Sequence, residues 1–157
     1  MPLLQIDEPF LAGYPEDVGV TWGLHVCYGN RYARPSWERH DDFLFPTVLD
    51  VNMDQLILEF ARKGYEDLEV IQRFGWDRAL GLGVMDVKIE QIESTELITQ
   101  RIHRALGTFP ADKLIINPDC GLRHLPAHVT RLKLSAMVEE TVAVRRTLLE
   151  PTVEQGA

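Results

Sequence analysis

Residues 23–30 read Gly23-Leu24-His25-Val26-Cys27-Tyr28-Gly29-Asn30, an apolar run that carries a histidine and a cysteine and ends in a Gly-Asn turn. Side chains at positions i and i+2 of a β-strand leave the same face, so we expect His25 and Cys27 to point to one spot. An imidazole and a thiolate side by side can begin a zinc site. Taken alone, such a pair is more often a packed cysteine beside a hydrogen-bonded histidine, so the rest of the chain must decide.

The length and composition of the chain limit the class of protein to which it can belong. Its 157 residues suffice for one domain with a hydrophobic core, and the net charge is -8. The longest basic cluster, Arg145-Arg146, offers no positive face for nucleic acid. No apolar run approaches the roughly 18–20 residues of a membrane span, and the N-terminus does not resemble a signal peptide. We therefore expect a cytoplasmic protein whose two cysteines, Cys27 and Cys120, are metal ligands or buried thiols rather than a disulfide.

Short apolar runs alternate with helical patterns along the chain. Strands are predicted at residues 3–6, 20–28, 55–60, 79–87 and 113–117, and helices at 65–73, 96–106 and 130–149, the last with a broad apolar stripe. A short helix is expected within 41–48, limited by Pro46. This alternation is typical of βα units around a parallel sheet. We expect one domain over residues 1–149 and a flexible tail over 150–157.

Polar residues recur where the predicted strands end. Parallel α/β folds bind their ligands at the carboxyl ends of the strands. The residues in question are Asp7, His25, Cys27, Glu59, Asp86, Lys88 and Cys120.

Four of these residues, His25, Cys27, Glu59 and Cys120, have side chains that zinc accepts as ligands. Each has an ordinary alternative, since Glu59 can be a strand-end carboxylate and Cys120 a buried turn residue, but together they favour a metal. Two thiolates and one carboxylate exceed the +2 charge of zinc by one. Such an electron-rich ion is suited to binding a thiol and lowering its pKa rather than to generating hydroxide.

Several motifs that occur in order along the chain resemble one family. The chain is similar to the C-terminal catalytic domain of cobalamin-independent methionine synthase and its shorter relatives, from about residue 3 to the final helix. The most specific motifs are His-x-Cys and Asn-Pro-Asp-Cys-Gly. The matching segments are Gln-Ile-Asp-Glu-Pro (5–9), His-Val-Cys-Tyr-Gly-Asn (25–30), Leu-Glu-Phe-Ala-Arg (58–62), Leu-Gly-Leu-Gly-Val-Met-Asp-Val (80–87) and Asn-Pro-Asp-Cys-Gly-Leu (117–122).

The resemblance implies a fold, a metal and a reaction. The family fold is a TIM-type (β/α)8 barrel with zinc at its C-terminal face, and the implied zinc ligands are His25, Cys27, Glu59 and Cys120. Asp7 matches an acidic residue that contacts the amino acid moiety of homocysteine. The family reaction transfers a methyl group to a zinc-bound thiolate, from methyltetrahydrofolate or from other donors in relatives.

Three departures from the family pattern concern the methyl donor more than the metal. Gly13 stands where the family has a glutamate that helps hold the folate. Lys88 replaces the proton-donating histidine; a lysine can donate a proton, but its reference pKa near 10.4 makes it a weaker acid unless burial lowers that pKa. A longer insertion separates Cys27 from Glu59, as in the shorter relatives.

A complete TIM barrel has eight strands in about 250 residues, whereas five strands are predicted here. We therefore expect an α/β fold that forms the C-terminal portion, about five βα units, of such a barrel. The open edges predict completion by a complementary barrel-half subunit or by a homo-oligomer, unless the chain is a fragment.

Three functions are consistent with the sequence. The first is a zinc-dependent methyltransferase, or a subunit of one, acting on a homocysteine-like thiol, with Asp7 holding the thiol's ammonium group and Lys88 assisting the leaving group. The second is a zinc-stabilised binding or scaffold subunit without independent catalysis. The third, a hydrolase with a metal-bound water, is disfavoured by the two thiolates. The methyl donor, the identity of the thiol and activity in isolation are not determined by the sequence.

Overall fold

The computed structural model describes residues 3–7, 19–30, 32–36 and 40–150, with residues 3–7 described by their backbone alone. Five parallel strands form one sheet in the order β1-β2-β3-β4-β5, which is also their order in the chain. The strands are β1 (Leu3–Asp7), β2 (Thr21–His25), β3 (Gln55–Leu58), β4 (Ala79–Met85) and β5 (Leu114–Pro118). The predicted α/β class and all five predicted strands are confirmed.

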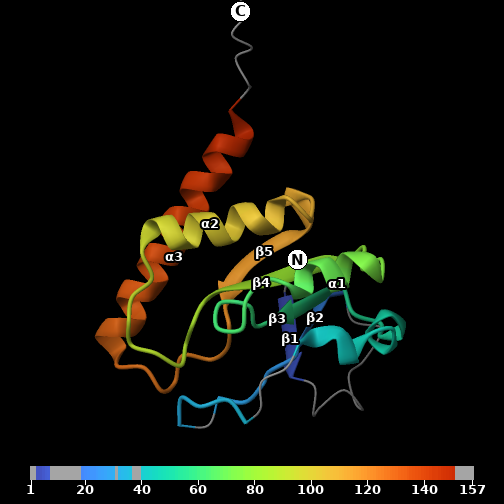
Figure 1. The fold of residues 1–157 in the computed structure, drawn as a ribbon, viewed down its shortest axis with the longest axis horizontal. Coiled ribbons are helices and arrows are strands. Elements are labelled where there is room, and N and C mark those ends of the chain that lie inside the picture. Colours follow the sequence, from blue (N-terminus) through green and yellow to red (C-terminus); the bar gives the residue numbers. More distant parts are fainter. Residues whose placement is uncertain (1–2, 8–18, 31, 37–39, 151–157) are drawn as a thin grey trace, which may run out of the picture.

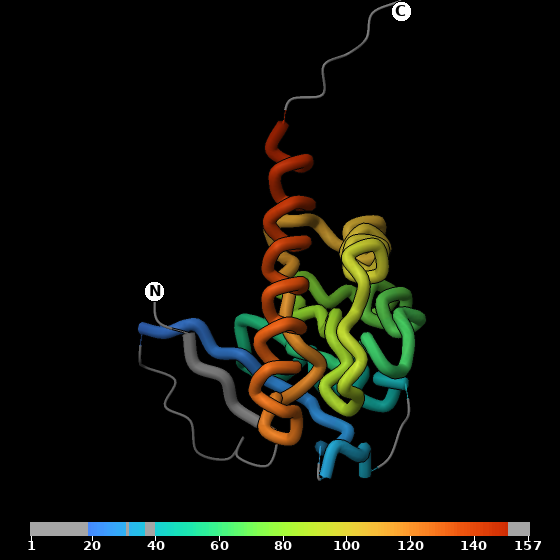
Figure 2. The backbone as a smooth tube through the Cα atoms, turned by 90° about the vertical axis from the view of Figure 1, so that its left-hand side faces the viewer, coloured from blue at the N-terminus to red at the C-terminus, as the bar shows by residue number. Residues whose placement is uncertain are grey.

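Three α-helices cover the sheet (Figure 1). They are α1 (Asp67–Arg73), α2 (Thr95–Leu106) and α3 (Ala127–Leu149). Ser94 caps the N-terminus of α2 by accepting a hydrogen bond from the backbone N–H of Leu97, as expected of a serine at this position. Helices α2 and α3 pack against each other beside β4 and β5, and Figure 2 shows the last turns of α3 standing clear of α2.

The core lies between the sheet and the helices. Alternate residues of each central strand face it, as the two-residue period of a strand requires. Leu68 and Ile71 of α1 and Ile98 and Ile102 of α2 pack onto this face of the sheet. Buried apolar strand residues of this core include Leu24, Leu56, Leu58, Leu80, Leu82 and Val84.

The opposite face of the sheet carries small and polar residues. Gly23, Gly81 and Gly83 lie at positions where an added Cβ would collide with Gln55, with Asn117 and with Asp119 respectively. These glycines therefore make room for polar side chains to lie across the sheet. This face corresponds to the interior of the predicted barrel.

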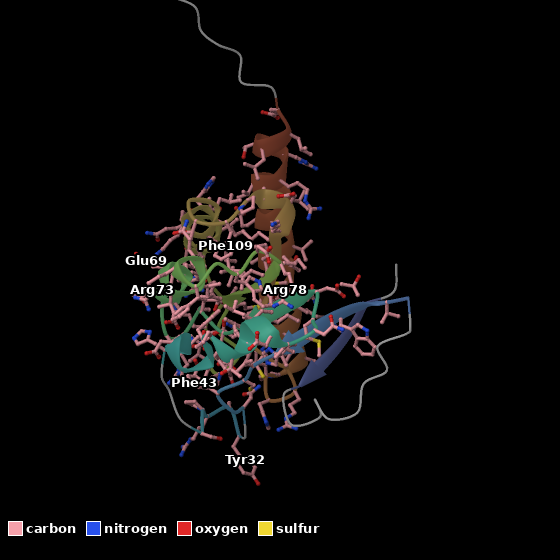
Figure 3. All side chains as sticks on the ribbon, turned by 90° about the vertical axis from the view of Figure 1, so that its right-hand side faces the viewer. Tyr32, Phe43, Glu69, Arg73, Arg78 and Phe109 are labelled. Atoms are coloured by element: carbon pink, nitrogen blue, oxygen red, sulfur yellow. The ribbon has the colours of Figure 1, made fainter. Side chains whose placement is uncertain are left out.

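The connection from β2 to β3 differs from the prediction. Instead of one short helix within 41–48, the chain forms two 3-10 helices, η2 (Asp41–Leu44) and η3 (Thr47–Asp50), on either side of Pro46. Proline has no N–H to continue an α-helix, which accounts for the interruption. The guanidinium of Arg78, a residue labelled in Figure 3, holds η3 in place by donating to the carbonyls of Leu49, Val51 and Met53. A further 3-10 helix, η4 (Ala111–Lys113), precedes β5.

The predicted apolar stripe on the last helix is only partly buried. Met137 and Val144 of α3 face the core, but Leu132 and Val138 are 52% and 54% exposed. Lys133 of α3 is fully buried. Its ammonium group lies 2.8 Å from a carboxylate oxygen of Glu93, and this ion pair compensates the buried charge. The pattern gave no sign of this ion pair, since Glu93 lies 40 positions away.

Within the described residues, every helix is too short or too polar to cross a lipid bilayer. Of the predicted tail, only Glu150 belongs to the part of the chain that the structure describes. The proposed division into residues 1–149 and 150–157 stays a prediction.

Candidate metal centre

The carboxyl ends of three strands bring four predicted ligands together. His25 is the last residue of β2 and Cys27 follows two positions later; Glu59 directly follows β3, and Cys120 lies two residues beyond β5. One ligand atom from each of the four residues lies within 4.8 Å of the other three. The Sγ atoms of Cys27 and Cys120 are 3.2 Å apart, although 93 positions separate them in the sequence. The prediction that these residues meet at one point agrees with this geometry.

Each ligand is held by its surroundings. His25 Nδ1 donates a hydrogen bond to the carbonyl of Ile57 at 3.2 Å, a bond that leaves Nε2 as the nitrogen with a lone pair for a metal. Cys27 Sγ accepts a hydrogen bond from the N–H of Gly29. Glu59 is 3% exposed and its Oε2 atom accepts a hydrogen bond from Lys88 Nζ at 2.7 Å. Its buried Oε1 atom has no hydrogen-bond partner among the described residues.

The two thiols influence each other's ionisation. Hydrogen bonding from Cys27, together with the nearby His25, lowers the pKa of Cys120 to about 4, although burial opposes this shift. The hydrogen bond to Cys120 and burial raise the pKa of Cys27 well above its usual range. Because the two Sγ atoms lie 3.2 Å apart, ionisation of one thiol hinders ionisation of the other.

This donor set fits a zinc ion. Two sulfurs, one imidazole nitrogen and one carboxylate oxygen are the ligand types of tetrahedral zinc sites. The buried Glu59 Oε1 atom, which lacks a hydrogen-bond partner in the described part of the chain, supplies an unsatisfied acceptor at the centre of the cluster. A buried acceptor of this kind is rare unless an ion or a ligand satisfies it.

The cluster opens into a cavity of about 550 Å³ on the small and polar face of the sheet. His25, Cys27 and Cys120 form part of its lining, together with Gln55, Asn117 and Arg123. The side-chain oxygens of Gln55 and Asn117 are buried and lack hydrogen-bond partners among the described residues. The cavity therefore places the guanidinium of Arg123 and the unsatisfied oxygens of Gln55 and Asn117 beside the candidate metal ligands. A small zwitterionic molecule could pair with both kinds of group. The sequence gave no signal for Gln55, and Asn117 drew notice only as part of the Asn-Pro-Asp-Cys-Gly motif.

The other two predicted site residues are Asp7 and Lys88. Asp7 ends β1 and pairs in register with His25, which puts its backbone at the same edge of the sheet. The side chain of Asp7 is not among those that the structure describes. Lys88 is 8% exposed and its ammonium group contacts Glu59. Burial alone would lower the pKa of Lys88, but the hydrogen bond and the charge of Glu59 raise that pKa above its usual value.

Asp119 supports the site from behind. Its carboxylate is fully buried and accepts hydrogen bonds from the backbone N–H groups of Phe60, Ala61 and Arg62 at 3.0, 2.9 and 3.2 Å. These three residues directly follow Glu59. Asp119 thus fixes the loop that follows Glu59. Because Asp119 is also the neighbour of Cys120 in the chain, it connects the positions of these two candidate ligands.

Gly83 makes room for this carboxylate, and its replacement by alanine tests the arrangement. A Cβ atom at position 83 would overlap Asp119 Oδ1 and would lie 2.9 Å from the carbonyl oxygen of Leu58. We expect Gly83→Ala to lower the free energy of unfolding by about 1–3 kcal/mol, as overpacking does in buried sites. Urea unfolding measures this loss, and Gly121→Ala is the control, because a Cβ atom added at position 121 would meet nothing within 4 Å. Equal stability of the two variants would contradict the expected loss.

A second cluster of charges, which the sequence did not reveal, anchors the insertion between Cys27 and Glu59. Lys63 Nζ lies 2.5 Å from Asp41 Oδ2, 2.7 Å from Asp67 Oδ2 and 2.9 Å from the hydroxyl of Tyr28. The hydroxyl of Tyr28 also donates to Asp41. Burial raises the pKa of Asp41 to about 6, even though Lys63 opposes the shift. Because Tyr28 follows Cys27 in the chain, this cluster ties the insertion to a ligand-bearing turn.

Comparisons with known proteins agree with this picture. The family model described as the catalytic domain of cobalamin-independent synthase matches residues 16–143. A methionine synthase of Saccharolobus islandicus (strain Y.G.57.14 / Yellowstone #1) is 36% identical over 93% of this chain and 45% of its own length. A methionine synthase of Thermococcus kodakarensis is 31% identical over 92% of this chain and 44% of its own.

A solved structure shows the same fold. It is the B12-independent methionine synthase from Shewanella sp. W3-18-1 in complex with selenomethionine. Its superposition covers 94% of this chain and 49% of the Shewanella chain, with a TM-score of 0.77 and 25% sequence identity. The chain thus spans about half the length of the relatives that it matches, consistent with a partial barrel. With its catalytic-domain model matched over most of the sequence, the chain belongs to the cobalamin-independent methionine synthase family.

Proposed function

We propose that this chain is the zinc-binding part of a methyltransferase that transfers a methyl group to a thiol such as homocysteine. The observation that carries the proposal is the convergence of His25, Cys27, Glu59 and Cys120, with one ligand atom from each within 4.8 Å of the others. Zinc bound there would lower the pKa of the thiol and hold its thiolate in a nucleophilic state. The family of the chain supports methyl transfer as the class of reaction.

The residues of the chain have distinct parts in this proposal. His25, Cys27, Glu59 and Cys120 would hold the metal, and Glu59 would be the ligand that a substrate thiol replaces. Asp7, at the end of β1 in register with His25, holds the ammonium group of the amino acid substrate. Lys88, whose ammonium group contacts the buried Glu59, assists the leaving group. The cavity beside the metal ligands would accept the thiol substrate.

The proposal includes a partner. In the described sheet, β1 and β5 each pair with a single neighbouring strand. An apolar groove of about 550 Å³ lies between β5, α2 and α3 and is lined in part by Leu114, Ile116 and Leu148. Unpaired parallel edges and apolar grooves are unstable in water. We expect a complementary barrel half or a second copy of the chain to cover them, in the cytoplasm, where cysteine thiols stay reduced.

A second function follows from the extent of the chain. Since it spans about half the length of its relatives, it can serve as a zinc-stabilised binding or scaffold subunit without independent catalysis. In that case the metal would support folding, and removal of the metal would unfold the protein.

Metal analysis and thiol binding separate the two functions. Protein purified without chelators is expected to contain one zinc per chain and to bind homocysteine, whereas the variant His25→Ala should lose both. One zinc without a response to homocysteine, and unfolding on chelation, would favour the scaffold. Absence of zinc would contradict both functions.

A further inference from the structure

The buried ion pair between Lys88 and Glu59 joins a non-ligand residue to the candidate metal centre. The two side chains are 1% and 4% exposed, and Lys88 Nζ lies 2.7 Å from Glu59 Oε2. Only one oxygen of the carboxylate is engaged in this way, because Oε1 has no hydrogen-bond partner among the described residues. The two oxygens of Glu59 thus differ: one is held by a cation, and the other is left for a metal.

The loop that carries Lys88 is itself fixed. The backbone N–H of Lys88 donates to Asp86 Oδ1 at 2.8 Å, and the backbone N–H of Asp86 donates to Glu93 Oε1 at 2.9 Å. Glu93 in turn pairs with the fully buried Lys133 of α3. The ammonium group of Lys88 therefore approaches Glu59 from a rigid support rather than from a mobile surface loop.

We propose that Lys88 is a positioning residue that makes Glu59 a displaceable metal ligand, an inference that rests on the proposed function. The ammonium group draws electron density from the carboxylate and so weakens it as a ligand. If zinc is bound, replacement of Glu59 by a thiol would exchange a metal–oxygen bond for a metal–sulfur bond, and the thiol proton would pass to solvent. Glu59 then remains ionised and paired with Lys88, so that no buried carboxylate is left without a counter-charge.

Removal of the ammonium group should therefore make displacement harder. Without Lys88, the Glu59 carboxylate donates to the metal with its full charge, and its release would leave a buried anion unpaired. Metal affinity in the absence of thiol should be kept or increased, while thiol affinity falls. A merely structural role for Lys88 would lower both together.

The test uses cobalt(II) in place of spectroscopically silent zinc and follows the sulfur-to-cobalt absorption band as homocysteine is added. The half-saturating homocysteine concentration should rise roughly tenfold or more in Lys88→Met and in Lys88→Gln, which keeps a hydrogen-bond donor but no charge. Lys88→Arg, which keeps the cation, should stay within about threefold of the wild type. Should Lys88→Met not fold, Lys88→Gln carries the same expectation.

A double-mutant cycle with Glu59→Gln shows whether Lys88 acts through Glu59. In the Glu59→Gln background no carboxylate needs to be displaced, so adding Lys88→Met should leave the half-saturating concentration unchanged. An unchanged concentration in the single Lys88 variants, or a shift that persists without Glu59, would overturn the inference. A wild-type protein whose band does not respond to homocysteine would instead contradict the proposed function, and with it this role of Lys88.

Discussion

Cys120→Ser is expected to abolish thiol binding while leaving the far-UV circular dichroism spectrum largely unchanged. Cys120 supplies one of two sulfurs at the centre, and its Sγ atom lies 3.2 Å from that of Cys27. A serine hydroxyl does not ionise at neutral pH and cannot replace a thiolate. We expect the metal affinity, measured by competition with a chelator, to fall by roughly a hundredfold or more, since even residues behind the ligands contribute 10–100-fold in metal sites.

The fold should survive this change because Cys120 lies in a turn beyond β5 and is only partly buried. Cys27→Ser provides the matched comparison and should lose metal to a similar degree. Two outcomes would contradict the expectation. Retention of wild-type metal affinity would show that Cys120 is not a ligand, and loss of the helical spectrum would show a structural rather than a catalytic metal.

Lys63→Met is expected to lower the free energy of unfolding by about 3–5 kcal/mol, the usual cost of removing one partner of a buried ion pair. Lys63 is the cation shared by Asp41 and Asp67, whose side chains are 0% and 1% exposed. The variant leaves the buried Asp41 carboxylate without a counter-charge, and leaves Asp67 with the hydrogen bonds from His40 Nδ1 and from the backbone N–H of Asp41. It also removes the ammonium group from above the ring of Tyr28, at 4.4 Å from the ring centre.

Urea unfolding measures this loss, and Lys113→Met is the matched control. The Lys113 ammonium donates to the carbonyl of Asp77 at the exposed surface, so its removal should cost about 1 kcal/mol or less. A Lys63→Met variant as stable as this control would show that the cluster does not hold the insertion in place.

Much of the sheet could be predicted from sequence because its strands are short apolar runs. The segment 79–87 is a clear example, since Leu80, Leu82 and Val84 alternate with glycines and all three are fully buried in β4. The insertion after Cys27 was harder. Its 3-10 helices depend on distant groups such as Arg78, which no local pattern reveals.

The convergence of His25, Cys27, Glu59 and Cys120 could be predicted because metal-ligand chemistry limits the choice to a few residue types at strand ends. Buried charges such as Lys133 and Lys63 could not, because a charged residue is expected at a solvent-exposed position until its partner is known. Lys88 lies between these cases. Its position in the Gly-Val-Met-Asp-Val-Lys run drew attention to it, but its contact with Glu59, 29 positions away, required the structure.

We propose that His25, Cys27, Glu59 and Cys120 hold a zinc ion that accepts a substrate thiol. X-ray absorption at the zinc edge, with and without homocysteine, tests this assignment. The resting protein should show two sulfur ligands and two nitrogen or oxygen ligands, and homocysteine should raise the sulfur count to three while one oxygen is lost. A sulfur count that stays at two in saturating homocysteine, or a metal bound without sulfur, would contradict the account.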